Sequence, residues 1–310
     1  MVQENKQLDI YKVDTSKKLN KIKVLIVILS LVAVLLMILI ILHIINIYKN
    51  YRVFKQYEAQ AIQIVQEQEE KARKEEEEKE EKERIRQERL PKLTDVGKEN
   101  IKNIYHSDTK RAFLTFDDGP SSVTPTILDI LKNENIKATF FVLGSRVEAM
   151  PSMVKRMYDE GHFIANHGYS HVYENIYASP ESVLDEYTKC NNAVINAIGE
   201  QDYESHLFRF PGGLAGGKYA DTKLAAKELL NQNNVVNVDW NALNGDGETN
   251  NLSIEFELER LKNTTEGKNS VVILMHDAPV KQVTSEALPQ IISYLREQGY
   301  EFKSFYDVIK

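Results

Sequence analysis

Hydrophobic and polar positions follow four successive patterns along the chain, and each pattern predicts a different structure. Residues 1–23 are polar and contain six lysines, whereas residues 24–48 contain no Asp, Glu, Lys or Arg and are rich in Leu, Ile and Val. Residues 49–105 are dominated by charge, and residues 106–310 alternate between strand and helix signals. We therefore expect a cytoplasmic tail, a transmembrane signal anchor, a charged helical stalk and a globular domain, in that order.

The apolar run of residues 24–48 is long enough to cross a membrane, because a spanning helix needs about 20 apolar residues. A buried core helix is the weaker alternative, since core helices rarely stay apolar on every side for this length. A cleavable signal peptide is the stronger rival, but the run is too long for its apolar part and no small-residue cleavage site follows. The pattern therefore predicts an anchor that is retained.

Basic residues on the two sides of the span predict its orientation. Six lysines precede the span, and Lys49, Arg52 and Lys55 follow it closely, which is a moderate bias toward a cytoplasmic N-terminus. Everything after Tyr48 would then lie outside the cytoplasm. We expect a single-pass protein of the cell membrane with an extracytoplasmic domain.

The charged segment of residues 49–105 has Glu and Lys at the i,i+4 spacing that supports a solvated helix, as in Glu70 and Lys74. A coiled-coil dimer is the alternative, but apolar a and d positions are not sustained after Val65. The pattern favours a polar stalk that holds the next domain away from the membrane.

From residue 106 onward, the alternation of strand and helix signals predicts an α/β domain with a largely parallel sheet. Helices are expected over residues 124–135, 151–161 and 179–199. The apolar runs that predict strands are residues 111–116, 138–143, 163–166, 207–210, 234–240 and 270–276.

Reactive side chains stand at the carboxyl ends of five of these strands. They are Asp117 and Asp118, His167 and His171, Arg209, Asp239 and Trp240, and His276. An open sheet gathers its site at a switch point between a few strands, whereas in a barrel all strand ends face one mouth. Convergence of five strands favours a barrel, and fewer than eight clear strands predict a distorted or incomplete (β/α) barrel.

Two short motifs carry the candidate chemistry. On a helix, His167 and His171 would share one face and could bind one metal ion, and on a loop the same spacing works less predictably. Asp117 and Asp118 are adjacent at a strand end and point to different sides, so one could bind metal while the other faces substrate. Taken alone, each motif also fits an ordinary surface pair or a polar turn.

Five motifs in this order, TFDDGP, HGYSH, FRFPGG, VDW and LMHD, resemble those of the polysaccharide deacetylases, the NodB homology domain of carbohydrate esterase family 4. The resemblance covers residues 108–308, and five motifs with this spacing are a specific signal. With the anchor and the stalk, it implies a membrane-anchored peptidoglycan N-acetylglucosamine deacetylase whose partner is an acetylated cell-wall glycan.

The resemblance implies one divalent metal ion, with zinc as the first expectation and cobalt or another divalent ion as alternatives. Its ligands would be Asp118, His167 and His171, a set that leaves metal positions open, as a hydrolytic site requires. The substrate pocket would be lined by Gly212, Trp240 and Leu274.

The catalytic roles are also implied by the resemblance. Asp117 would be the general base and His276 the general acid on the leaving amine, and hydrolysis of an amide needs both. Arg209 would pair with Asp117 and fix it. Asp239 would orient His276.

Two positions depart from the family pattern. Gly168 stands where Ser or Thr is usual, which puts the rigidity of the histidine loop in question. Gly212 stands where Tyr is frequent, and since that Tyr acts through its backbone N–H, glycine can serve while a wall of the cleft is lost. Two further acids, Asp246 and Glu248, are interpreted as loop residues.

Composition narrows the remaining alternatives. The chain has 310 residues with 39 Lys+Arg and 46 Asp+Glu, so its net charge of −7 implies no basic surface for nucleic acid. The single cysteine, Cys190, excludes an intrachain disulfide and a thiolate metal cluster. The alternatives left open are a deacetylase of chitin, xylan or an exopolysaccharide, an inactive glycan-binding module, and a structural stalk protein. The filled catalytic positions count against the last two.

Overall fold

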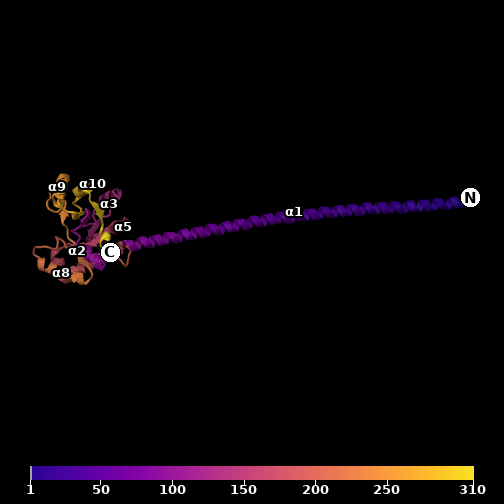
Figure 1. Ribbon diagram of the computed structural model, residues 1–310. Helices are drawn as coiled ribbons and strands as arrows, with labels where there is room; N and C mark the ends of the chain where they lie inside the picture. The colour runs from indigo at the N-terminus through magenta and orange to yellow at the C-terminus, as the bar shows by residue number, and fades with distance from the viewer. Residues whose placement is uncertain (1) are drawn as a thin grey trace. The chain divides into compact units, whose positions relative to one another are not determined.

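The computed structural model describes the backbone of residues 2–310 and the side chains of residues 14–310 (Figure 1). The chain divides into two compact units, one ending at Glu81 and the other running from Lys82 to Lys310. The helix α1 (Val2–Arg89) forms the first unit and continues into the second.

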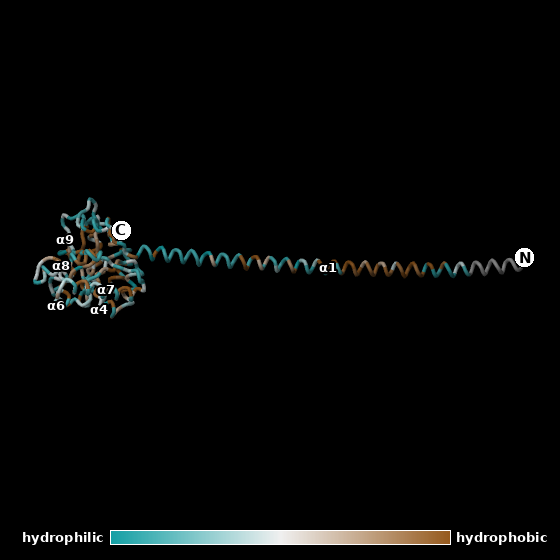
Figure 2. The backbone as a smooth tube through the Cα atoms, turned by 90° about the horizontal axis from the view of Figure 1, so that it is seen from below, coloured by the Kyte–Doolittle hydropathy of each residue, from teal (hydrophilic) through white to brown (hydrophobic). Residues whose placement is uncertain are grey.

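Hydropathy changes sharply along α1, from hydrophobic in the region of the predicted span to hydrophilic beyond it (Figure 2). Among residues 14–310, one helical stretch, Asp14–Arg89, is long and apolar enough to cross a membrane by length and composition. Exposed ion pairs at i,i+4 follow the apolar part, as between Lys74 Nζ and Glu70 Oε1 at 2.7 Å. This helix is therefore a candidate membrane span followed by a solvated segment.

In the part of the chain that the structure describes, the second unit is built on an eight-stranded parallel sheet with the order β5-β4-β3-β2-β1-β7-β6, and β8 pairs with β1. The sheet curls into a half-barrel, which confirms the predicted distorted or incomplete (β/α) barrel. Its strands are β1 (Arg111–Asp117), β2 (Thr139–Val142), β3 (Phe163–Asn166), β4 (Leu207–Phe208), β5 (Val236–Asn237), β6 (Ala242–Leu243), β7 (Ser270–His276) and β8 (Glu301–Lys303).

Helices connect the strands and cover the sheet. They are α2 (Asp95–Lys102), α3 (Thr124–Asn133), α4 (Gly144–Ala149), α5 (Pro151–Asp159), α6 (Tyr173–Ile176), α7 (Pro180–Ile198), α8 (Ala220–Gln232), α9 (Ile254–Thr265), α10 (Gln282–Glu297) and the short 3₁₀ helix η1 (Phe305–Asp307). The three predicted helices are present as α3, α5 and α7. Helix α7 begins where the Ser179 hydroxyl accepts the Ser182 N–H and ends at Gly199 with φ +81°, as its sequence predicts.

The predicted strand over residues 234–240 is wrong in extent. Only Val236–Asn237 pair with β4, and the chain then crosses to the other edge of the sheet, where β6 pairs with β7. The carbonyl groups of Val238 and Asp239 accept hydrogen bonds from the Arg209 side chain at 3.0 and 3.1 Å. These carbonyls bind a guanidinium in the gap between the two edge strands, so the strand ends there.

The second unit begins before residue 106 and takes in the end of the predicted stalk. Arg86 Nε donates to Glu200 Oε2 at 2.6 Å, and Leu90 is buried. Ile101 and Ile104 join the apolar cluster inside the half-barrel. Residues 82–105 are therefore part of the compact unit.

Candidate active site

Alternate residues of four strands face the inside of the half-barrel, because side chains along a strand alternate between its two faces. Nearer the amino ends of the strands, these inward positions form one apolar cluster that includes Phe113, Phe163, Leu207 and Val272. Toward the carboxyl ends of the strands, two or four residues later on the same faces, the side chains are polar. They are Asp117, His167, Arg209 and His276. Strand alternation thus brings four predicted site residues from distant parts of the sequence to one mouth.

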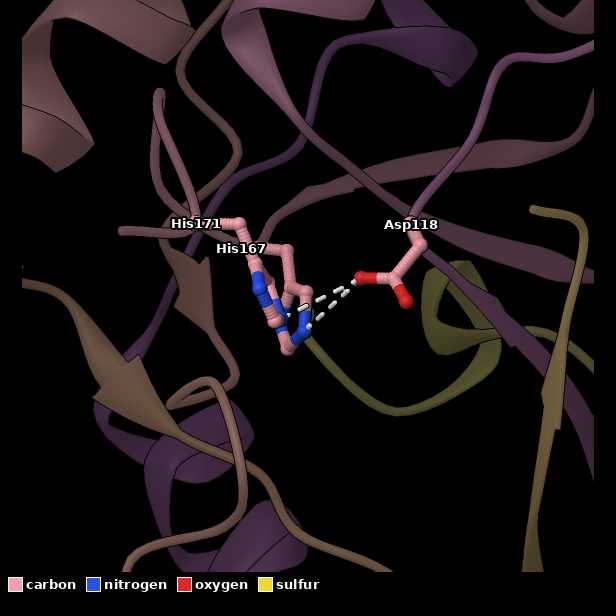
Figure 3. A group of neighbouring side chains, drawn as sticks. All are labelled: Asp118, His167 and His171. Carbon is pink, nitrogen blue, oxygen red and sulfur yellow. Dashed lines mark ion pairs between the residues drawn. The ribbon is translucent and has the colours of Figure 1, made fainter. Parts of the chain in front are cut away.

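Asp118, His167 and His171 come together as a candidate metal site, with ligand atoms within 4.8 Å of one another. Asp118 Oδ1 lies 3.6 Å from His167 Nε2 and 3.4 Å from His171 Nε2 (Figure 3). Two ligands of a tetrahedral zinc ion with bonds of about 2.0–2.1 Å would be separated by about 3.3 Å. In Figure 3 the two imidazoles stand side by side and face the carboxylate.

Two further observations fit this trio to a metal ion. Asp118 Oδ1 is buried and has no hydrogen-bond partner among the described residues, although buried polar atoms usually have one. His167 Nδ1 lies 2.7 Å from the Arg209 carbonyl oxygen, so Nδ1 donates and Nε2 keeps its lone pair for the site. Burial lowers the pKa of His167 to about 3, which keeps its ring neutral, the form that binds metals.

The two histidines lie on the loop after β3 and not on a helix, which settles the alternative that the spacing left open. Gly168 has φ +86°, and a Cβ there would lie 2.9 Å from a side-chain carbon of α6. The buried carboxylate of Glu186 accepts the backbone N–H groups of Tyr169 and Ser170 at 2.6 and 2.7 Å, and the Ser170 hydroxyl at 2.8 Å. Glu186 thus braces the loop in which Gly168 replaces the Ser or Thr that is usual in the family.

Arg209 is the buried cation beneath the site. Its side chain is fully buried, and Nη1 donates to Asp117 Oδ1 and to Thr115 Oγ1, each at 2.8 Å. Nε and Nη2 each donate to one of the two carbonyls in the gap between the edge strands. Phe141 lies under the guanidinium, with its ring centroid 3.9 Å from the guanidinium carbon. Arg209 is thereby fixed, and it fixes Asp117.

Asp117 stands between this cation and the candidate metal site. While Oδ1 binds Arg209, Oδ2 lies 3.8 Å from His167 Nε2. Burial raises the pKa of Asp117, and the charges of Arg209 and His276 oppose that rise. The carboxylate is thus more basic than its ordinary value and still paired, which suits a group that must take up a proton.

The partner of His276 is Asp246, and the prediction that Asp239 orients it is wrong. His276 Nδ1 lies 2.7 Å from Asp246 Oδ1, and the His276 backbone N–H donates to Asp246 Oδ2 at 2.8 Å. The Asp239 carboxylate instead accepts the Leu214 N–H at 3.2 Å. The reason is topological: the loop that follows β6 lies beside the end of β7, whereas Asp239 follows β5 at the opposite edge of the sheet.

This pairing sets the charge of His276. Burial lowers its pKa, but the hydrogen bond and the charge of Asp246, together with Asp117 and Asp118, outweigh burial and raise it to about 9. His276 is therefore an imidazolium at neutral pH. Nδ1 is bound to Asp246, so Nε2 is the nitrogen that can donate a proton in the cleft.

A cleft of about 380 Å³ opens above these residues. Its lining includes Asp117, Asp118, His167, His171, Gly212, Trp240, Leu274 and His276, as well as Tyr173. Gly212 has φ +72°, and a Cβ on it would lie 2.6 Å from Tyr173 Oη. Tyr173 of α6 thus occupies the space of the missing side chain. Its only signal in the sequence is an aromatic residue two positions after His171.

Comparison with known proteins gives consistent matches. Residues 105–234 match the family model described as polysaccharide deacetylase. The chain is 36% identical over 198 residues to the putative polysaccharide deacetylase YheN of Bacillus subtilis, a match that covers 62% of this chain and 66% of that protein. It is 37% identical over 194 residues to the peptidoglycan-N-acetylglucosamine deacetylase PgdA of Listeria monocytogenes, covering 62% of this chain and 37% of that protein. The matched region therefore spans less than two thirds of either relative.

The fold also has solved counterparts. A Streptococcus mutans CE4 esterase aligns with a TM-score of 0.61 and 32% identity, covering 66% of this chain and 90% of that chain.

Proposed function

Because the chain belongs to the polysaccharide deacetylase family, we propose that it hydrolyses acetyl groups from N-acetylglucosamine residues of cell-wall peptidoglycan. The observation that supports the proposal is a cleft in which Asp117, the proposed base, and His276, the proposed acid, stand beside the candidate metal site. The name of the Listeria monocytogenes relative supports the substrate class.

Asp117 is the proposed general base. It takes a proton from the water whose oxygen attacks the acetyl carbonyl carbon, and Arg209 holds the carboxylate in place as the proton arrives. A positioned acid or base typically contributes about 10²–10⁴-fold to a rate. Fixing one oxygen by a fully buried guanidinium leaves the other oxygen as the proton acceptor.

His276 is the proposed general acid. As the C–N bond breaks, it gives a proton to the departing nitrogen, so that acetate and a free amine leave the site. An amine is a poor leaving group unless it is protonated, and the charged state of His276 at neutral pH meets that need. Asp246, in place of Asp239, is the proposed orienting carboxylate.

Asp118, His167 and His171 are the proposed metal ligands, with zinc ahead of cobalt or another divalent ion. When bound, the ion supplies Lewis-acid polarisation of the acetyl carbonyl oxygen. Trp240 and Leu274 form the proposed slot for the acetyl methyl group, since both line the cleft.

We also propose that residues 24–48 anchor the protein in the cell membrane, with residues 1–23 in the cytoplasm and the catalytic unit outside. The apolar stretch of α1 supports this proposal. Protease added to intact wall-less cells should remove the catalytic unit and leave a short N-terminal stub. A unit that is digested only after lysis would show that the orientation is reversed.

The deciding experiment is a substrate panel with the full-length chain in detergent and one equivalent of zinc. Acetate release is measured on purified peptidoglycan, on chitin oligomers and on acetyl-xylan, with Asp117→Asn as the inactive control. Fastest release from peptidoglycan is expected. Release from another glycan alone would change the substrate, and binding without any release would indicate a glycan-binding module.

A further inference from the structure

Asp246, the proposed partner of His276, belongs to a row of buried polar side chains whose other members have no part in the steps above. Thr284 Oγ1 is 3.0 Å from Asp246 Oδ2 and 3.2 Å from Glu257 Oε1. Glu257 Oε2 accepts the side-chain N–H of Asn244 at 2.7 Å. Asp246 is 1% exposed, and Thr284 and Glu257 are 0% exposed. The row therefore joins Glu257 to the proposed general acid through two intervening side chains.

The hydrogen atoms in this row do not suffice if both carboxyl groups are ionised. A threonine hydroxyl has one hydrogen, so Thr284 can donate to Asp246 or to Glu257 but not to both. The other contact would then bring two lone pairs together at hydrogen-bond distance, and two anions would share a dry site. One additional proton resolves both conflicts, because a protonated carboxyl can donate to Thr284 while Thr284 donates to the other carboxylate.

The donors around the two carboxyl groups indicate which one holds this proton. Asp246 accepts two N–H groups of His276 in addition to Thr284. Glu257, apart from Thr284, accepts the Asn244 amide. Charged donors and a larger number of donors favour the ionised form. The anion is therefore more stable on Asp246, and the proton on Glu257.

The charges that face Glu257 agree with this assignment. Burial and the charge of Asp246 raise the pKa of Glu257 to about 7, against the opposing effects of Thr284, Asn244 and Lys281. Lys281 Nζ binds the carbonyl oxygen of Asp246, which places that cation nearer to Asp246. Glu248 and Arg260 pair with each other at 2.7 Å, and both side chains are partly exposed.

We propose that Glu257 is a positioning residue: it holds a proton up to about neutral pH and, through Thr284, keeps Asp246 as the anion that orients His276. The inference rests on the proposed function, in which His276 is the general acid. It also predicts a link to pH. When Glu257 loses its proton, a second negative charge lies behind His276 and holds the imidazolium more tightly.

The direct test is infrared difference spectroscopy of the full-length, zinc-loaded chain in detergent. The C=O band of a protonated carboxyl should be present at pH 6, weaken toward pH 8, and be absent from Glu257→Gln. Asp277, whose pKa burial also raises to about 7, contributes equally to both proteins and cancels in the difference. Glu259→Gln, an exposed position on the same helix, is the matched control and should keep the band. If Glu257→Gln removes no such band, the proposal is overturned.

Kinetics on purified peptidoglycan give the second readout. Glu257→Ala should lower kcat by about tenfold or more, by analogy with the cost of removing a group that orients a metal-ligating histidine. Glu257→Gln should lose less than Glu257→Ala, since its amide can still donate to Thr284. Its alkaline limb of kcat/KM should lie at lower pH than in the wild type and in Glu259→Gln, because no second anion can form.

An unmoved alkaline limb in Glu257→Gln, or a loss as large as in Glu257→Ala, would overturn the proposal. If no variant, the wild type included, releases acetate, the proposed function fails, while the infrared result still decides the protonation of Glu257.

Discussion

Two histidines face the same cleft, one buried and one partly buried, and their pKa values are shifted in opposite directions. His167 meets a backbone carbonyl through Nδ1, and burial lowers its pKa to about 3. His276 meets a carboxylate through Nδ1, and Asp246 outweighs burial to raise its pKa to about 9. The partner behind each ring thus decides its chemistry: a neutral ring can ligate a metal ion, and a charged ring can donate a proton.

The largest expected effect is on the metal side of this comparison. His167→Ala and Asp118→Asn should each lower metal content well below one ion per chain. Acetate release should fall by about 10³-fold or more, since the ion's charge stabilisation is worth several kcal/mol. Elemental analysis and kcat on the same preparations measure both effects, and excess zinc or cobalt should partly restore activity. Full metal content in both variants would place the metal elsewhere.

The second effect separates Asp117 from its neighbour Asp118. Asp117→Asn should keep the metal ion and lower kcat by about 10²–10⁴-fold, because the base is lost while the ligand trio stays intact. The same pair of measurements applies. Loss of metal in Asp117→Asn, with metal retained in Asp118→Asn, would exchange the two assigned roles.

The third effect tests the acid side, with Asp239→Asn as the matched control. In the wild type His276 is charged below its pKa of about 9, so activity should fall as pH rises through that value. Asp246→Asn removes the anion that holds the proton, and the alkaline limb of kcat/KM should move to lower pH, with kcat reduced about 10–100-fold. Asp239→Asn should leave that limb in place. A limb that moves with Asp239 and not with Asp246 would restore the sequence-based assignment.

His276 could be predicted from the sequence together with the candidate metal ligands, but its partner could not, for a physical reason. Asp117, Asp118, His167 and His276 stand at ends of strands whose alternation and parallel pairing follow from local apolar patterns. The partner of His276 depends instead on where a two-residue strand pairs.

The two-residue strands β5 and β6 have no distinct pattern of apolar residues, and residues 234–240 have the apolar pattern of a single strand. Arg209, which interrupts that strand by binding its carbonyls, comes from a distant part of the sequence. The half-barrel was predictable from the β/α alternation together with the reactive side chains at the ends of five strands, whereas the bracing by Glu186 and the filling of the cleft by Tyr173 depend on contacts between loops and helices.

The smallest expected effect concerns the loop that carries the two histidines proposed as metal ligands. Glu186→Gln keeps the shape of the side chain, but it exchanges a carboxylate that accepts three hydrogen bonds for an amide with one acceptor oxygen. The N–H groups of Tyr169 and Ser170 both bind Oε2, so the loop should keep its fold while losing charge-assisted bonds. Groups that support metal ligands typically cost 10–100-fold in affinity when removed, and this conservative change should lie near the lower end, about tenfold.

The measurement is zinc affinity by competition with a chelator, with Asp185→Asn as the control because Asp185 is the exposed neighbour on the same helix. The alkaline limb of kcat/KM is set by His276, so it should not move in Glu186→Gln, because His276 is held by Asp246 and not by Glu186. Unchanged zinc affinity would mean that Glu186 does not support the proposed metal ligands, and a shift of that limb would mean that the two sides of the cleft are coupled.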